Sequence, residues 1–321
     1  MSNSSVDPEL QPILAAFKEL WGDTAMDLDD LEGARQTHDA MSAQRNSAAD
    51  EIEGVNTHRE IIRNSDLGVE VVAYVHQPSQ ASEAPRRAML HIHGGGYVTG
   101  RASHAEPQLR LLAKQFDCLI VSVDYRLAPE HPFPAALYDC FSTLQWLHSR
   151  ADKLNIDAAK IIVLGESAGG GLAAGLSMYA RDHSDIKIAQ QILLYPMLDY
   201  RNTAALAEGE SDTIVWSRQN NIIGWGAYMG EGVDESMLAY ASPSYAKDSS
   251  GLPPTYACIG DIDLFCQETI DYIELLRDAE VITELDVYPG AYHAFQVVVP
   301  DAAVSQTCLK KLDQILAQAF A

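Results

Sequence analysis

Short apolar segments alternate with helical segments from about residue 61 onward. The runs AKIIVLG, QQILLYP and PTYACIG have the continuous hydrophobicity of strands that are buried on both faces, as in parallel sheets. Five further segments also have strand character, namely REIIR, GVEVVAYVHQP, RRAMLHIHGG, CLIVSVDYR and ITELDVYPG. Helices are predicted over residues 133–154, 168–183, 217–229, 267–279 and 301–320. This alternation predicts an α/β protein with a mostly parallel sheet and helices on both of its faces.

Two regions lie outside this alternation. Residues 1–58 have the composition of polar helices and contain no predicted strand. Residues 200–245 follow QQILLYP and have a helical centre at WSRQNNIIGWGAYMG. A long insertion in a compact α/β protein more often forms a lid or a wall of a binding site than a segment without a function. We therefore expect both regions to cover one end of the sheet.

The composition limits the partners and the location of the chain. Its 321 residues include 22 Lys and Arg and 45 Asp and Glu, a formal net charge of −23 at pH 7. Because such a surface repels phosphate groups and anionic lipids, neither nucleic acid nor a membrane is expected as a partner. Strong acidity also occurs in salt-adapted proteins, so salt adaptation stays open. The absence of a secretory signal and the 5 cysteines without C-x-x-C spacing favour a cytoplasmic protein with reduced thiols.

The motif Gly165-Glu166-Ser167-Ala168-Gly169 follows a predicted strand and opens a helix of small residues. This is G-x-S-x-G in the strand–turn–helix context in which a sharp turn holds the serine above the sheet. The helix after the turn directs its first N–H groups toward whatever the serine attacks. The pattern predicts Ser167 as a nucleophile.

A second glycine cluster, His93-Gly94-Gly95-Gly96, ends the strand RRAMLHI. Consecutive glycines allow backbone N–H groups to approach a ligand closely. An oxyanion hole needs such donors about 3 Å from the oxygen on which negative charge develops. Taken alone, the cluster fits a flexible turn equally well. Beside the nucleophile motif, it indicates an oxyanion hole.

Two carboxylates and a histidine follow the last two predicted strands. Asp261 and Asp263 come directly after PTYACIG, and His293 comes just after the strand that ends in YPG. These positions share the sheet edge at which Ser167 is expected. A neutral imidazole can accept the serine proton, and a carboxylate fixes the tautomer that does so. The nearness of both carboxylates to the strand does not choose between them.

Five motifs occur in order along the chain, namely HGGG (93–96), DYRLAPE (124–130), GESAGG (165–170), GDIDLF (260–265) and YHAF (292–295). Together they resemble the hormone-sensitive lipase family of bacterial esterases, over about residues 70–300. The resemblance implies an α/β-hydrolase fold, with a mostly parallel eight-stranded sheet, flanking helices and a helical cap. It also implies a serine carboxylesterase that hydrolyses short-chain acyl esters without a cofactor or a metal.

The resemblance divides the chain into four parts. Residues 1–58 and 200–245 correspond to the two parts of the cap, and residues 59–199 and 246–321 correspond to the two parts of the α/β-hydrolase core. The expected partner is a small-molecule ester. A homodimer stays open.

The family pattern also assigns the acid. It places the acid three residues after the glycine of GDIDLF, which selects Asp263 and leaves Asp261 to cap the following turn. The predicted triad is then formed by Ser167, His293 and Asp263. The chain departs from the family in having Leu264 where proline is usual, which weakens the placement of the acid.

For the oxyanion hole, the family implies donors on the HGGG glycines and on the residue after the nucleophile. These are Gly95, Gly96 and Ala168, with Gly94 positioning them. A second departure is Glu166, where aspartate is commoner, and it does not touch the triad.

Some of the same residues are compatible with other functions. Residues 169–174 fit the G-x-G-x-x-A dinucleotide fingerprint, but these glycines are predicted inside a helix and not in the turn directly after the strand. His91 and His93 share one face of a strand, where they could bind a metal, but no further ligand motif follows. The same fold also serves as a receptor that has lost a triad member, whereas all three members are present here. Amide or carbamate hydrolysis would use the same site and stays open.

Overall fold

The computed structural model describes residues 5–21, 26–48, 52–204 and 215–320. Its eight-stranded sheet has the order β1-β2-β4-β3-β5-β6-β7-β8. The strands are β1 (Val55–Asn64), β2 (Val69–Pro78), β3 (Arg86–Ile92), β4 (Leu119–Asp124), β5 (Ile156–Glu166), β6 (Gln190–Leu194), β7 (Thr255–Gly260) and β8 (Thr283–Tyr288). The pairs β1–β2 and β2–β4 are antiparallel, and the other neighbouring pairs are parallel. The predicted fold class, a mostly parallel eight-stranded sheet, is confirmed.

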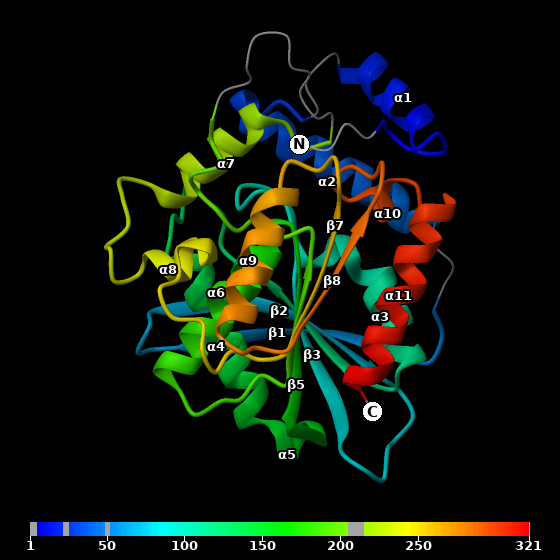
Figure 1. Cartoon of the computed structure of the whole chain (residues 1–321). Coiled ribbons are helices and arrows are strands. Elements are labelled where there is room, and N and C mark those ends of the chain that lie inside the picture. The colour runs from blue at the N-terminus through cyan, green and yellow to red at the C-terminus, as the bar shows by residue number, and fades with distance from the viewer. Residues whose placement is uncertain (1–4, 22–25, 49–51, 205–214, 321) are drawn as a thin grey trace.

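Helices cover both faces of the sheet, as Figure 1 shows. One face carries α3 (Glu106–Gln115) and α11 (Ala303–Ala319), and the other carries α4 (Ala135–Ser149), α6 (Ala168–His183) and α9 (Cys266–Asp278). At the end toward which β8 points lie α1 (Gln11–Trp21), α2 (Leu31–Ala48) and α7 (Arg218–Met229). The shorter helices are α5 (Ala151–Leu154), α8 (Leu238–Ala241), α10 (Phe295–Val298) and the 3-10 turns η1 (Leu28–Asp30), η2 (Ala102–Ala105) and η3 (Pro243–Tyr245).

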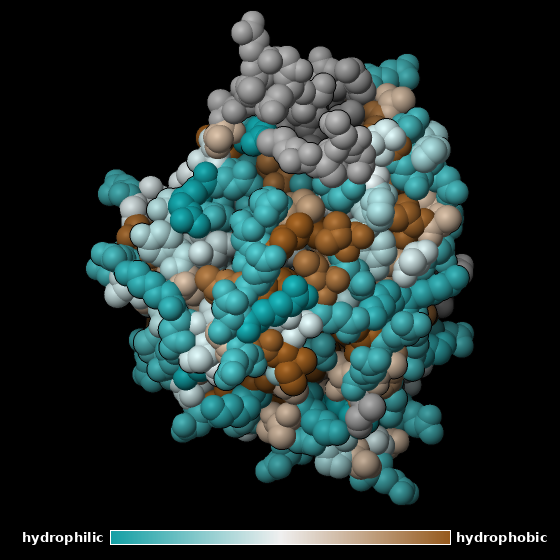
Figure 2. All heavy atoms as spheres, in the orientation of Figure 1, coloured by the Kyte–Doolittle hydropathy of each residue, from teal (hydrophilic) through white to brown (hydrophobic). Residues whose placement is uncertain are grey.

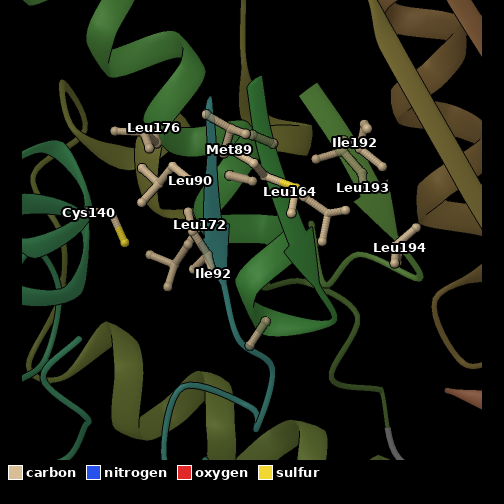
Figure 3. Close-up of a cluster of buried hydrophobic side chains, with 14 of the residues drawn as sticks. Met89, Leu90, Ile92, Cys140, Leu164, Leu172, Leu176, Ile192, Leu193 and Leu194 are labelled. Carbon is tan, nitrogen blue, oxygen red and sulfur yellow. The ribbon is translucent and has the colours of Figure 1, made fainter. Parts of the chain in front are cut away.

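The main core lies between the central strands and helix α6. Figure 3 shows side chains of this core from β3, β5, β6 and α6, among them Met89, Ile92, Leu164, Leu172 and Ile192. Every residue of β7 is buried, as expected for a strand that is covered on both faces. Full burial of a Leu, Ile or Met side chain contributes about 1.5–3 kcal/mol to the stability of the fold. The packed central strands therefore form a rigid support for the loops at their carboxyl ends.

Strand β1 corrects the expectation that residues 1–58 contain no strand. It begins at Val55, and in it only Val55 and Ile62 are buried. As the edge strand of the sheet, β1 pairs with β2 alone, and most of its side chains are polar and solvent-facing. The predicted strand REIIR (59–63) lies within β1. The four residues before it, of which only Val55 is buried, lack the apolar alternation by which strands are recognised in a sequence.

Two helical segments also differ from expectation. Helix α3 lies in a stretch to which the sequence assigned no element. The helix predicted over 133–154 is divided at Arg150, whose φ of −104° and ψ of 12° end α4 before α5 begins. Residues 205–214, within the predicted second part of the cap, lie outside the described residues.

The face drawn in Figure 2 is mostly hydrophilic, with small hydrophobic areas near its middle. The most exposed of the large hydrophobic side chains are Ile282 and Leu111, at 76% and 52%. Among the described residues, no helix combines the length and the apolar character that crossing a membrane requires.

Candidate active site

Ser167 stands at a strained turn between β5 and α6. Its φ of 54° and ψ of −120° lie outside the regions that a residue with a side chain normally adopts. A Cβ on Gly165 would lie 2.1 Å from the carbonyl oxygen of Gly169, and a Cβ on Gly169 would lie 2.1 Å from that of Ile92. Only glycine fits at both positions, so the motif explains how the chain turns sharply enough to hold Ser167 above the sheet.

Ser167, His293 and Asp263 form one hydrogen-bonded chain of buried side chains. The Nε2 atom of His293 lies 2.9 Å from Oγ of Ser167, and its Nδ1 atom lies 2.8 Å from Oδ2 of Asp263. Because a carboxylate accepts only, Nδ1 carries the proton, and Nε2 is then free to accept the proton of the serine hydroxyl. The structure thus brings together the three side chains that the sequence predicted.

Two rings and one backbone amide hold this chain in place. The rings of Tyr195 and Phe265 meet the His293 ring edge-on, at centroid distances of 4.9 and 5.2 Å. The second oxygen of Asp263 accepts a hydrogen bond of 2.9 Å from the backbone amide of Phe265. Neither the imidazole nor the carboxylate is therefore free to rotate away from Ser167.

Asp261 has a partner that the sequence did not predict. Its carboxylate accepts a hydrogen bond of 2.7 Å from the backbone amide of Gly290, in the loop that leads from β8 to His293. The expectation that Asp261 caps the turn directly after β7 missed this contact, because the two residues are 29 positions apart in the sequence. Asp261 joins the loop of the acid to the loop of the histidine.

The amides of Gly95 and Gly96 are oriented through the carbonyl groups of their own peptide units. The carbonyl of Gly94 accepts a hydrogen bond of 2.8 Å from Nδ1 of His93, and the carbonyl of Gly95 accepts one of 2.9 Å from the amide of Thr99. In a trans peptide unit, the N–H and C=O groups point in opposite directions. The N–H groups of Gly95 and Gly96 therefore point away from these partners, and neither donates to another described residue.

The amide of Ala168 is oriented in the same way. The carbonyl of Ser167 accepts hydrogen bonds from the amides of Gly170, Gly171 and Met197, at 2.9, 3.1 and 2.9 Å. The N–H of Ala168 consequently points in the opposite direction, and within the described parts of the chain it has no hydrogen-bond partner.

Gly94 allows the two amide-bearing segments to approach each other. A Cβ on Gly94 would lie 3.0 Å from the carbonyl oxygen of Glu166 and 3.2 Å from Cβ of Ser167. Burial lowers the pKa of the neighbouring His93 to about 3, so its ring is neutral and donates from Nδ1 to Gly94. This arrangement fits the positioning part expected for Gly94.

Arg35 of α2 binds the loop of residues 93–100, called the glycine loop below. The sequence did not indicate this contact. The Nε of Arg35 donates to the carbonyl of Val98 at 2.8 Å, and its Nη2 donates to the carbonyl of Ala128 at 3.0 Å. Both terminal nitrogens also bind the carboxylate of Glu130, at 2.7 and 2.8 Å. The Arg35 guanidinium holds the pKa of Glu130 at about 2, well below its usual range.

A cavity of about 530 Å³ opens above Ser167. It is bounded by the glycine loop, α2, η2, α3 and the segment after His293, and its lining is mainly apolar. Trp216 and Tyr195 form part of its wall near Ser167. The cavity can therefore hold a small apolar molecule against Ser167, His293 and Gly95, which all line it.

The glycines and the histidine behind the two binding alternatives have contacts within the fold. Gly169, Gly170 and Gly171 lie inside α6, where a Cβ on each would collide with the ends of β3 or with the segment after β6. His91 is buried and contacts Oγ of Ser122 at 2.9 Å. The described part of the chain contains no group of three His, Cys, Asp or Glu side chains placed to hold a metal.

Comparison with known proteins agrees with this geometry. A family profile described as "alpha/beta hydrolase fold" matches residues 89–297. The chain is 35% identical to "Esterase LipI" of Mycobacterium tuberculosis over 230 residues, which is 70% of each protein. It is 33% identical to "Carboxylesterase NlhH" of the same organism over 220 residues, 67% of this chain and 69% of the relative.

Solved structures show the same relationship. The structure titled "Bacterial Heroin Esterase" superposes with a TM-score of 0.90 at 34% identity, covering 99% of this chain and 98% of that one. The esterase LipW from Mycobacterium marinum gives a TM-score of 0.81 at 31% identity, covering 99% and 98%. The chain therefore belongs to the α/β-hydrolase superfamily and, within it, to the hormone-sensitive lipase family of bacterial esterases.

Proposed function

We propose that the chain is a serine carboxylesterase that hydrolyses short-chain acyl esters of small alcohols. The observation that carries the proposal is the hydrogen-bonded chain of Ser167, His293 and Asp263 at the base of a mainly apolar cavity. The esterase names of the relatives support ester hydrolysis as the reaction. The preference for short acyl groups rests on the family resemblance and on the small number of large hydrophobic side chains that are exposed among the described residues.

The reaction proceeds in two acyl-transfer steps. Nε2 of His293 takes the proton of Ser167 as Oγ attacks the ester carbonyl carbon, and the amides of Gly95, Gly96 and Ala168 bind the oxyanion. The C–O bond to the alcohol then breaks, and His293 passes its proton to the leaving oxygen. Water repeats the sequence on the acyl-enzyme, which releases the acid and restores Ser167.

We further propose that residues 1–58 and 200–245 contribute to a cap over the substrate. The support is that α2 reaches the glycine loop through Arg35, while Met26, His38 and Trp216 line the cavity above Ser167. Covering the cavity excludes water from the oxyanion site, where hydrogen bonds to developing charge are then strongest.

Substitution of the nucleophile tests the function directly. Ser167→Ala should lower kcat for p-nitrophenyl butyrate by several orders of magnitude with an unchanged circular dichroism spectrum, because covalent catalysis is lost. Ser177→Ala is the matched control, since Ser177 lies in α6 with its hydroxyl donating to the carbonyl of Ala173. Near-normal turnover by folded Ser167→Ala would refute the proposal.

A further inference from the structure

Trp216 lies against the loop that carries the oxyanion amides. The residue is 6% exposed and lines the same cavity as Ser167. A Cβ on Gly96 would lie 2.0 Å from a ring carbon of Trp216, so the ring occupies the space that a side chain at position 96 would need. A Cβ on Gly224 of α7 would lie 3.4 Å from the same ring. The indole therefore fills the gap between the glycine loop and α7.

A series of hydrogen bonds that begins at Nε1 fixes the orientation of the Trp216 ring. The Nε1–H of Trp216 donates to Oδ1 of Asn221 at 3.2 Å, and Nδ2 of Asn221 donates to the carbonyl of Asn202 at 2.5 Å. The Nδ2 of Asn202 donates to Oε2 of Glu268 at 2.8 Å. Asn221 and Glu268 are buried, and Asn202 is half-buried. The orientation of the indole is therefore tied to the carboxyl group of Glu268 at the beginning of α9.

The carboxyl group of Glu268, at which this series of hydrogen bonds ends, is itself held in place. Its other oxygen accepts a hydrogen bond of 2.7 Å from the amide of Leu198, so both oxygens face N–H donors. Burial raises the pKa of Glu268 to about 8, and these donors oppose the rise. Burying an acid costs free energy, which is offset only where hydrogen-bond partners are in place. The proposed reaction does not use this acid, so its position calls for another explanation.

The same series of hydrogen bonds also reaches the loop that holds Asp263, the acid of the triad. Besides its contact with Glu268, Nδ2 of Asn202 donates to the carbonyl of Leu264 at 3.1 Å, one residue after Asp263. Asn202 thus joins the support of Trp216, through its backbone carbonyl, to the loop that holds Asp263, through its side chain. A shift of Asn202 would disturb both.

The side of the ester that Trp216 faces follows from the proposed reaction. His293 protonates the leaving oxygen, so the alcohol lies on the side of the histidine, where Tyr195 and Phe265 flank the ring. Trp216 instead contacts Gly96, on the side of the oxyanion amides. The acyl chain, which is bonded to the same carbon as the alcohol oxygen, extends away from the histidine. We infer from this that the acyl group, rather than the alcohol, faces the indole.

We propose that Trp216 sets the limit on acyl length, and that Glu268 is a positioning residue that holds Trp216 through Asn202 and Asn221. The inference rests on the esterase function proposed above and specifies which part of the substrate the site selects. The Trp216 ring excludes long acyl chains by occupying space, and the buried hydrogen bonds keep the ring from moving aside.

Two ester series test the first part. The acyl series comprises p-nitrophenyl acetate, butyrate and hexanoate, and the alcohol series comprises phenyl acetate and 1-naphthyl acetate. In Trp216→Ala, the ratio of kcat/KM for hexanoate to that for acetate should rise about tenfold, since each methylene that gains a pocket improves transition-state binding. The ratio within the alcohol series should stay as in the wild type. Trp216→Phe keeps a ring but lacks the Nε1–H, and should raise the acyl ratio by a smaller factor.

Substitutions along the hydrogen-bond chain test the second part. Glu268→Gln keeps the size of the side chain but turns an NH₂ group toward a donor, and Asn221→Leu leaves Nε1 of Trp216 without its acceptor. Both variants should shift the acyl ratio in the direction of Trp216→Ala and by less. Glu235→Gln is the matched control, because Glu235 is exposed and pairs with the exposed Lys247, and its ratio should be unchanged. Stability loss alone would lower the rate on all esters equally and leave the ratio fixed.

The outcomes separate the possible failures. An acyl ratio unchanged in both Trp216 variants, or a change confined to the alcohol series, would overturn the role of Trp216. A shifted ratio in the Trp216 variants with wild-type ratios in Glu268→Gln and Asn221→Leu would overturn the positioning role of Glu268. If the wild type hydrolyses none of the esters, the proposed function itself fails.

Discussion

Asp261 and Asp263 stand two residues apart after β7, but their carboxylates have different partners. Asp263 binds the imidazole of His293 at 2.8 Å, whereas Asp261 binds the backbone amide of Gly290 at 2.7 Å. The first contact can fix the tautomer that accepts the serine proton, and the second can only hold a loop. Substitution of Asp263 by asparagine should therefore affect kcat, whereas substitution of Asp261 should affect stability.

Asp263→Asn should lower kcat by up to about ten-thousand-fold, by analogy with the serine proteases, because His293 is then free to adopt the wrong tautomer. Asp261→Asn should cost about 1 kcal/mol of stability and change kcat little. Both rates are measured on p-nitrophenyl butyrate, with the folded fraction determined by circular dichroism. If Asp261→Asn abolishes turnover while Asp263→Asn retains it, the assignment of the acid is wrong.

Among the elements, α2 has a connection to the site that its sequence does not reveal. Arg35 donates to two backbone carbonyls and to Glu130, and one of those carbonyls belongs to Val98 in the glycine loop. Hydrogen bonds from a charged group contribute about 1.5–3 kcal/mol each when the partner is buried, and less when it is exposed. The docking of α2 should accordingly depend on this side chain.

Arg35→Leu should lower the free energy of unfolding by about 2 kcal/mol and should also lower kcat/KM, since the glycine loop loses an external support. Arg63→Leu serves as the control, because the Arg63–Glu70 pair on β1 and β2 is 65% and 64% exposed and should contribute less than about 1 kcal/mol. Urea unfolding and steady-state kinetics measure both effects. Equal stability losses in the two variants, or an unchanged kcat/KM in Arg35→Leu, would contradict this role.

The sequence predicted those parts of the site that depend on local structure. The turn at Ser167 needs glycine at positions 165 and 169 for steric reasons, so the motif is visible in the sequence. Buried parallel strands such as β7 are also visible, because every residue in them is buried. The chain order of serine, acid and histidine followed from these strand ends.

Features that depend on distant partners could not be predicted. Arg35 bonds to an atom 63 residues away, and Glu268 bonds to Asn202, 66 residues away. No spacing rule connects such pairs, and an arginine in a polar helix is ordinarily a solvated side chain. The first four residues of β1 and the whole of helix α3 were missed because half-exposed elements carry a weaker hydrophobic pattern than buried ones.

At the scale of the whole molecule, buried and half-buried histidines link stability to pH. Burial lowers the pKa of His38 from 6.5 to about 4, and those of His76 and His93 from 6.5 to about 3. The unfolded chain takes up a proton on each as the pH falls through 6.5, whereas the folded protein does so only near pH 3 to 4. In that window the unfolded state binds more protons, so stability falls as the pH falls, by roughly 1 kcal/mol per pH unit for each imidazole.

His76→Gln should remove one of these contributions at a distance from Ser167, since His76 is buried on β2 and contacts the hydroxyl of Thr57 at 2.9 Å. The slope of the unfolding free energy against pH, measured with urea between about pH 5 and 6.5, should decrease by about one proton. Identical slopes in wild type and His76→Gln would contradict the assignment.

The central claim is that Ser167 carries the acyl group between the two steps of ester hydrolysis. Acid quenching during turnover of p-nitrophenyl acetate, followed by mass spectrometry of the intact protein and of its peptides, detects this intermediate directly. The account predicts one acetyl group on the peptide that contains Ser167, and none in Ser167→Ala. An acetyl group on a different residue during turnover, or full turnover by Ser167→Ala, would contradict it.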